Sequence, residues 1–251
     1  VLERMQKVER PDKEDACIFK EKLEPLTLGS KNVLEADHLK IGYESSIREL
    51  TLRIRRGQKV AVLGANGAGK TTFFKTIIGQ IPPISGKYNI GNGIITGYFD
   101  QHSAQIQSEK RVEDHFGECF PKLTEKEKRQ ILGKYLFPSQ KANEKINNLS
   151  GGEKSRLILA EVLESRPNFL ILDEPTNHLD LPAKETMESA FSAYTGTMLF
   201  ISHDRYFISK LADALLLFEE DGVKYYPFGY EHYIHMLKKK RDGNQTWADV
   251  V

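Results

Sequence analysis

The sequence predicts an α/β fold with a largely parallel sheet at its core. Short apolar runs of strand length alternate with helical patterns along the chain, which is the order that β-α-β units produce. Three of these runs are "KVAVLG" from Lys59, "NFLILDEP" from Asn168 and "TMLFISHD" from Thr197, and each ends abruptly in glycine or polar residues. Parallel strands have this apolar character because both faces of their sheet are covered.

The expected elements follow in chain order. Residues 1–30 are rich in charge and indicate the end of a helix that breaks at Pro11, followed by an exposed linker. Strands are expected over "NVLEADHLKIGY", "ELTLRIRRG", "KVAVLG" and "GIITGYFDQ", with a helix over "KTTFFKTIIGQ". Helices are expected over about 102–165. An aromatic turn and a basic helix over "YYPFGYEHYIHMLKKKR" close a domain of residues 31–241, and residues 242–251 form a tail.

Composition limits the class of protein. The 251 residues suffice for one large domain or two small ones. A formal charge of +1 gives no overall attraction to nucleic acid or anionic membrane. No apolar run approaches the roughly 20 residues that span a bilayer, so no membrane partner is expected. Only Cys17 and Cys119 are present, which fits a reducing, cytoplasmic compartment. Because the chain begins with Val1 rather than Met, we expect a piece of a longer protein.

A glycine-rich segment, "GANGAGKT" from Gly64 to Thr71, fits the phosphate-loop pattern G-x-x-x-x-G-K-[ST]. Its glycines let successive backbone N–H groups point inward at phosphate oxygens, and the helix that follows adds its positive end. Lys70 would place a point charge between the β- and γ-phosphates, and the Thr71 hydroxyl would bind Mg²⁺. The alternative is a chance match in a glycine loop.

Acidic side chains end one of the apolar strands. Asp173 and Glu174 follow "FLIL" directly, and ligands of open α/β sheets bind beyond the carboxyl ends of the strands. Asp173 is therefore expected to hold Mg²⁺ through water. Glu174 would orient or deprotonate the attacking water. The alternative is a solvated acidic turn.

Two further side chains stand at strand ends. His203 follows "LFIS" and would donate to the γ-phosphate while holding the water and Glu174 in place; the alternative is an ordinary surface histidine. Gln101 ends "GYFDQ", and its amide would reach Mg²⁺ and the water. On these grounds Glu174, His203 and Gln101 are the candidate catalytic residues, and Thr71, Gln101 and Asp173 the candidate metal ligands.

Five motifs occur in one order, namely "GANGAGKTT", "YFDQ", "LSGGEKSR", "LILDEPTNHLD" and "ISHDR". Together they resemble an ABC-type ATPase domain, over residues from about 32 to 236. The segments "GGEKSR" and "TNHLD" bring the resemblance closer to the ABC-F family of soluble tandem ATPases, mostly translation and ribosome-protection factors. Transporter ATPases more often carry Gln after the two glycines and Ser-Ala before the Leu-Asp pair. The charged N-terminal segment is similar to the end of that family's inter-domain linker, so the chain resembles a second, C-terminal domain.

The resemblance implies a RecA-like P-loop core with a mainly parallel sheet, an antiparallel β subdomain and a helical signature subdomain. It implies that ATP is the ligand and Mg²⁺ the metal. Tyr43 would stack on adenine, although a strand-end aromatic is an equal alternative. The full set implied in ATP binding is Tyr43, Gly64, Ala65, Asn66, Gly67, Ala68, Gly69, Lys70, Thr71 and Thr72.

The resemblance also explains two adjacent glycines at a helix start. The signature residues Ser150, Gly151, Gly152 and Glu153 would face ATP held by a partner domain. Small residues let backbone N–H groups approach a γ-phosphate across an interface, and Ser150 would cap the helix. Asp180 would lie at the domain contact, and His203 would act as a switch that responds to the γ-phosphate.

The implied function is ATP binding and hydrolysis that close and open paired ABC domains on the ribosome. The partner would be a second ABC domain, in the same full-length chain or in a weak homodimer. The alternative is an ATPase subunit of an ABC transporter. The segment "NHLD" and the N-terminal linker argue against it. A third possibility is a binding module that does not turn over ATP usefully. The presence of Glu174, Gln101 and His203 argues against such an inactive site.

Overall fold

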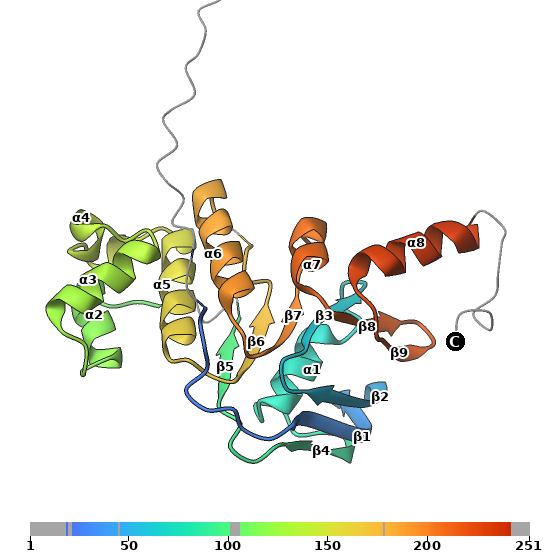
Figure 1. The fold of residues 1–251 in the computed structure, drawn as a ribbon. Coiled ribbons are helices and arrows are strands. Elements are labelled where there is room, and N and C mark those ends of the chain that lie inside the picture. Colours follow the sequence, from blue (N-terminus) through green and yellow to red (C-terminus); the bar gives the residue numbers. More distant parts are fainter. Residues whose placement is uncertain (1–18, 20–21, 45, 101–105, 178, 242–251) are drawn as a thin grey trace, which may run out of the picture.

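The fold was obtained as a computed structural model that describes residues 19, 22–44, 46–100, 106–177 and 179–241 (Figure 1). Two sheets and the helices around them make up this part of the chain. The larger sheet has six strands in the order β5-β6-β7-β3-β8-β9. Its strands are β3 (Lys59–Gly64), β5 (Thr96–Phe99), β6 (Phe169–Asp173), β7 (Thr197–Ile201), β8 (Ala214–Glu219) and β9 (Gly222–Tyr226).

The larger sheet is parallel from β5 to β8, and β9 pairs antiparallel with β8 at the edge. Both of its faces are covered, which explains the unbroken apolar runs. In β6, Leu170 and Leu172 pack into the core on one face, while Phe169 and Ile171 pack into the core on the other, as the alternation of side chains along a strand requires. The predicted parallel core is confirmed.

The smaller sheet is antiparallel and has the order β2-β1-β4. Its strands are β1 (Asn32–Gly42), β2 (Ser46–Arg55) and β4 (Ser85–Ile90). The helix α1 (Lys70–Ile77) lies between the two sheets (Figure 1). Phe73 and Phe74 of α1 are fully buried, in one hydrophobic cluster with Leu34 of β1 and Val60 of β3. This packing fixes the start of α1 above the end of β3.

Helices cover the opposite face of the larger sheet (Figure 1). They are α5 (Gly151–Glu164), α6 (Leu181–Ala193) and α7 (Arg205–Leu211), and α8 (Tyr230–Arg241) follows β9. Three short helices, α2 (Val112–Cys119), α3 (Glu125–Lys134) and α4 (Ser139–Ala142), and the 3₁₀ turn η1 (Ile146–Asn148) form a separate helical region beside α5. Helix was expected over this part of the chain, and the described residues from 112 to 164 are mainly helical.

Two local assignments differ from the sequence prediction. Tyr225 and Tyr226, expected in an aromatic turn, are the last residues of β9, and Tyr226 is buried against the core. The strand expected over "GIITGYFDQ" is shorter than predicted: β5 begins at Thr96 and ends at Phe99. β4 was not predicted; it lies at the edge of the smaller sheet, and its side chains are exposed or half-buried.

Candidate active site

The glycine-rich loop joins β3 to α1. A Cβ at Gly64 would lie 2.7 Å from Cβ of Phe218, so the neighbouring strand admits no side chain there. Gly67 and Gly69 have φ values of 78° and 100°, which only glycine adopts readily. Gly69 is the N-cap of α1, and no side chain in the described part of the chain caps this helix end. The first N–H groups of α1 are therefore not capped by a side chain and are suited to bind an anion.

Lys70 lies at the start of α1 with its ammonium over the loop. Its Nζ donates to the carbonyl oxygens of Gly64 at 2.8 Å and Ala65 at 2.9 Å. Burial lowers the pKa of Lys70, while Glu174 and Asp173 act in the opposite direction. An ammonium has three donors, so one remains for a ligand inside the loop.

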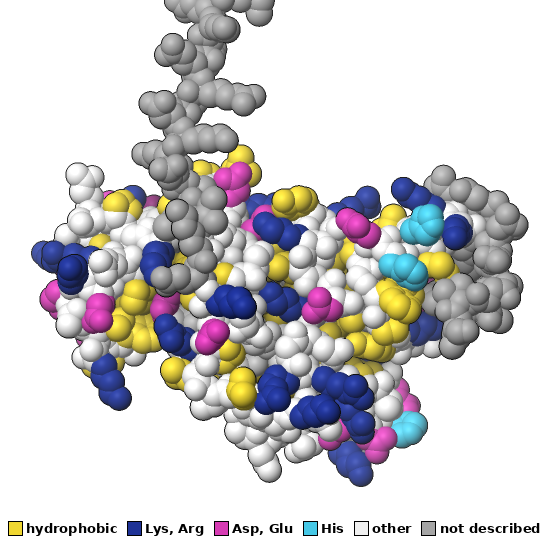
Figure 2. Space-filling view, viewed as in Figure 1, with side chains coloured by type: hydrophobic (Ala, Val, Ile, Leu, Met, Phe, Trp, Pro, Cys, Tyr) yellow, Lys and Arg dark blue, Asp and Glu magenta, His cyan; other side chains and the backbone are white. Residues whose placement is uncertain are grey.

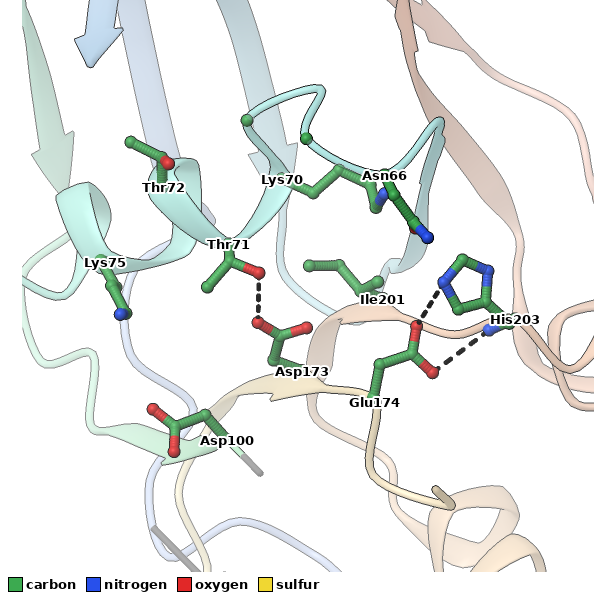
Figure 3. Close-up of a pocket in the computed structure, with 12 residues that line it drawn as sticks. Asn66, Lys70, Thr71, Thr72, Lys75, Asp100, Asp173, Glu174, Ile201 and His203 are labelled. Atoms are coloured by element: carbon green, nitrogen blue, oxygen red, sulfur yellow. Dashed lines mark hydrogen bonds and ion pairs between the residues drawn. The ribbon is translucent and has the colours of Figure 1, made fainter. Parts of the chain in front are cut away.

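A hydroxyl and a carboxylate meet at the ends of α1 and β6. Thr71 Oγ1 donates to Asp173 Oδ2 over 2.7 Å (Figure 3). Burial raises the pKa of Asp173; the Thr71 hydrogen bond lowers it, and the nearby Asp100 carboxylate raises it. A buried carboxylate beside a second carboxylate is stabilised by a cation at this place.

Glu174 is held in an unusual conformation beside His203. Its φ of 51° is rare for a residue other than glycine, and its N–H donates to the Ile201 carbonyl at 3.0 Å. The His203 N–H donates to Glu174 Oε2 at 3.3 Å. Glu174 Oε1 is buried, accepts no hydrogen bond from the described residues, and lies 3.4 Å from Nε2 of His203 (Figure 3).

The ionisation of Glu174 is controlled by opposing effects. Burial raises the pKa of this carboxyl, and the charge and backbone N–H of His203 lower it. His203 itself is open to solvent, with 67% of its side chain exposed. The result is a carboxylate with a raised proton affinity at the edge of an accessible pocket, which is the property of a general base.

Strand register brings these groups together. Asp173 of β6 pairs with Ile201 of β7, and Ile201 also pairs with Val62 of β3, two residues before Gly64. The ends of the three strands therefore surround one pocket with a volume of about 410 Å³. It is lined by Asn66, Gly67, Gly69, Lys70, Thr71, Thr72, Lys75, Asp100, Asp173, Glu174, Ile201 and His203 (Figure 3).

Other predicted nucleotide-binding residues lie away from this pocket or outside the described part of the chain. Tyr43 follows β1, is 62% exposed, and is not among the pocket residues. The Ala65 carbonyl accepts from Lys70, and Ala68 is buried as part of the hydrophobic core. Gln101 lies outside the described residues.

The signature residues form the start of α5, and none of them lines the pocket. Ser150 is the N-cap: its Oγ accepts from the Glu153 N–H at 3.2 Å, and Glu153 Oε2 accepts from the Ser150 N–H at 2.8 Å. Among the described residues, nothing lies within 4 Å of where a Cβ at Gly151 would be. Packing within this domain therefore does not require glycine at 151, and Ser150 and Gly151 are exposed. Asp180 is also exposed and caps α6 by accepting from the Ala183 N–H at 3.0 Å.

Two charged pocket residues were not predicted. Asp100 follows β5, receives a hydrogen bond from the Tyr98 hydroxyl at 2.9 Å, and lies close enough to Asp173 to raise its pKa. Lys75 lies one turn after Thr71 on α1. The sequence did contain a signal for Asp100: like Asp173, it is an acidic residue at the end of an apolar strand.

This fold and site define a P-loop nucleotide-binding domain, and comparison with known proteins specifies the family. The model of the ABC transporter family matches residues 47–177, just over half of the 251 residues. The chain belongs to this family of ATP-hydrolysing domains. Among the described residues, no helix combines the length and apolar character needed to cross a bilayer.

Curated relatives are considerably longer than this chain. A Bacillus subtilis protein named as an ATP-binding protein, YdiF, is 43% identical over 80% of this chain and 32% of its own length. The ATP-binding protein Uup-like of Haemophilus influenzae is 38% identical over 88% of this chain and 50% of its own length. The ABC transporter F family member 5 of Arabidopsis thaliana is 34% identical over 81% of this chain and 30% of its own length. The match thus spans 30% to 50% of the length of these relatives.

Solved structures confirm the fold. A bacterial Atm1-family ABC exporter with ATP bound superposes with a TM-score of 0.69, at 22% identity, over 88% of this chain and 41% of that one. The cbiO1 protein of Clostridium perfringens, part of an ABC transporter complex, gives 0.65 at 24% identity, over 84% of this chain and 94% of that one. At these identities the likeness concerns the fold alone.

Proposed function

We propose that the pocket holds the phosphates of ATP together with Mg²⁺, and that hydrolysis takes place at the ends of β3, β6 and β7. The observation that carries this proposal is the presence of two pairs around one pocket. Thr71 and Asp173 are 2.7 Å apart, and Glu174 and His203 are 3.4 Å apart. The first pair supplies oxygen ligands, and the second supplies a base with a positioning group.

The donor set fits Mg²⁺, which prefers hydroxyl, carboxylate and water oxygens. Thr71 and Asp173 would hold the ion, with Asp100 near enough to contribute through water and Gln101 as a further ligand. When bound, Mg²⁺ would neutralise charge on the β- and γ-phosphates. The loop N–H groups, the start of α1 and the Lys70 ammonium would bind the phosphate chain. Glu174 would accept a proton from water, and His203 would contact the γ-phosphate.

The signature at the start of α5 would complete the site of a second ABC domain. Three observations support this: Ser150 and Gly151 are exposed, they lie outside the pocket of their own domain, and Gly151 has open space around it. A domain that approached this helix end would meet backbone N–H groups without steric hindrance, and Asp180 would contribute to the contact. The partner would be the other half of a longer chain or a second copy.

We further propose a whole protein of the ABC-F type, in which residues 1–30 end an inter-domain linker and residues 31–241 form the second ATPase domain. The identity to a relative named as an F family member supports this, as does the length of the relatives. In this family assignment the target is the ribosome and the compartment the cytoplasm. On the face drawn in Figure 2, Lys and Arg are interspersed with Asp and Glu. Contact with the ribosome through this face would therefore not depend on one continuous positive patch.

Co-sedimentation tests the ribosomal role. The full-length Glu174→Gln protein should move with ribosomes when ATP is present and stay in the supernatant without it, because closed ATP-bound domains persist when hydrolysis is blocked. The same protein with Lys70→Ala added is the matched control and should lose the ATP-dependent shift. Without any ATP-dependent shift, a transporter ATPase or another target becomes the better assignment.

A further inference from the structure

The helical region contains a group of side chains with the composition of a metal site. His115 and Cys119 are both on α2, four residues apart, so they lie on the same face of that helix. Glu161 lies on α5, which runs beside α2 (Figure 1). One possible ligand atom from each of the three residues lies within 4.8 Å of the other two. Nothing in the proposed ATPase chemistry uses this group.

The spacing is close to what a small metal ion needs. Ligand atoms around tetrahedral Zn²⁺ are about 3.3–3.8 Å apart, given bond lengths of about 2.0–2.3 Å. His115 Nε2 and Glu161 Oε1 are 3.0 Å apart. Glu161 Oε1 is buried; it forms an ion pair with the His115 ring when the imidazole is protonated, but it accepts no well-directed hydrogen bond from the described residues. An ion between the two atoms would satisfy this oxygen after a small adjustment of the side chains.

Access and charge also favour a cation. Cys119 is exposed, which gives an ion a path from solvent. Glu118 adds negative charge nearby, although it is paired with Lys110 at 2.6 Å.

We propose that His115, Cys119 and Glu161 bind a divalent transition-metal ion, foremost Zn²⁺, with water as the fourth ligand. Imidazole, thiolate and carboxylate are all ligands that Zn²⁺ accepts. Binding needs the Cys119 thiolate and a neutral His115 ring, so the protons that these two groups carry leave to solvent as the ion binds. The ion would join α2 to α5, the helix that begins with the signature at Ser150, and would stabilise the helical region by mass action.

Metal titration of the 251-residue chain, freed of metal with a chelator, tests the proposal. Co²⁺ alone serves as the first probe, because thiolate coordination gives a charge-transfer absorption that oxygen ligands do not. Displacement by Zn²⁺ then gives the affinity. The absorption should appear in wild type and in Cys17→Ser, which removes the other cysteine, and should be absent in Cys119→Ser.

The affinities provide the second part of the test. His115→Gln and Cys119→Ser should each weaken Zn²⁺ binding at least about tenfold, the smallest loss expected on removal of a metal-site group. Glu118→Gln, a neighbour outside the triad, should keep the wild-type affinity. Unchanged nucleotide binding and circular dichroism would show that the variants fold. The proposal is wrong if wild type gives no thiolate absorption, if the absorption depends on Cys17, or if Cys119→Ser binds Zn²⁺ as tightly as wild type.

Discussion

At the residue scale, Glu174 shows how backbone conformation and burial act on one side chain. A positive φ costs about 1–3 kcal/mol for a residue other than glycine. The N–H of Glu174 is fixed by the Ile201 carbonyl at 3.0 Å, and the carboxylate is turned toward His203. The strained turn therefore aims the side chain at the pocket instead of along the strand. Because burial also raises the pKa, the carboxylate is a better proton acceptor than an exposed glutamate.

Glu174→Gln should keep ATP binding and lose most turnover. The amide is nearly the same size, so the packing survives, but it has no basic oxygen for the proton of water. General base contributions are about 10²- to 10⁴-fold in rate, and a loss in this range is expected in phosphate release under saturating ATP. Glu220→Gln, at an exposed position, is the control and should turn over normally. Wild-type rates in Glu174→Gln would move the base to another residue, with His203 the next candidate.

His203→Gln should change the pH dependence of the residual activity. As the proposed general base, Glu174 would act in its ionised form, so the rate should fall as the pH drops through its pKa. The His203 ring lowers the pKa of Glu174, and burial raises it. Without the ring the pKa rises, and the acid limb of kcat/KM should move to higher pH.

The comparison is made between complete pH profiles, because loss of the proposed γ-phosphate contact would also lower the absolute rate. His235→Gln removes an exposed histidine on α8 and should leave the acid limb in place. An acid limb that stays in place or moves to lower pH in His203→Gln would show that the ring does not act on Glu174.

At the element scale, the sequence determines the buried strands more clearly than the edge strands and the site details. β3, β6 and β7 were predicted because unbroken apolar runs occur where both faces of a sheet are covered. β4 was missed because its six residues, "SGKYNI", are mostly polar and none is fully buried. The positive φ of Glu174 and the contacts of Lys70 with Gly64 and Ala65 depend on neighbouring strands. Such contacts leave no periodic pattern in the sequence. Asp100 could have been predicted from its place after β5.

Two helices begin with the same capping box, which allows a matched test of the signature. Thr124 with Glu127 caps α3, and Ser150 with Glu153 caps α5. Thr124→Ala and Ser150→Ala should each lower the free energy of unfolding by about 1 kcal/mol, measured by urea denaturation. If Ser150 also contacts the ATP of a partner domain, only Ser150→Ala should reduce ATPase activity at high protein concentration. Equal activities in the two variants would limit Ser150 to its capping role.

At the scale of the whole molecule, the phosphate loop and the signature lie apart. The pocket is bounded by the ends of β3, β6 and β7, while Ser150 begins α5 beside the helical region and is not among its lining residues. Under the proposed function, a complete site would combine the loop of one domain with the signature of another. In a symmetric pair of this chain there would be two such sites, each shared between the copies.

Shared sites predict that two inactive variants complement each other. Lys70→Ala lacks the charge at the phosphates, and Ser150→Arg blocks the approach to a partner's γ-phosphate, so each should be inactive alone. In a mixed pair one site carries both defects. The other joins the intact loop of the Ser150→Arg copy to the intact signature of the Lys70→Ala copy. The mixture should then release phosphate, and wild-type activity per domain should rise with concentration as pairs form. If Ser150 served its own domain's site, every copy would carry a defect and no rescue could occur.

The shared site would be refuted by two results together. Wild type would be active at a rate strictly proportional to the enzyme concentration, and the mixture would release no phosphate at the same concentration. If the isolated chain pairs too weakly for concentrated wild type to be active, the same two substitutions should be compared with the other ATPase domain of the full-length protein attached.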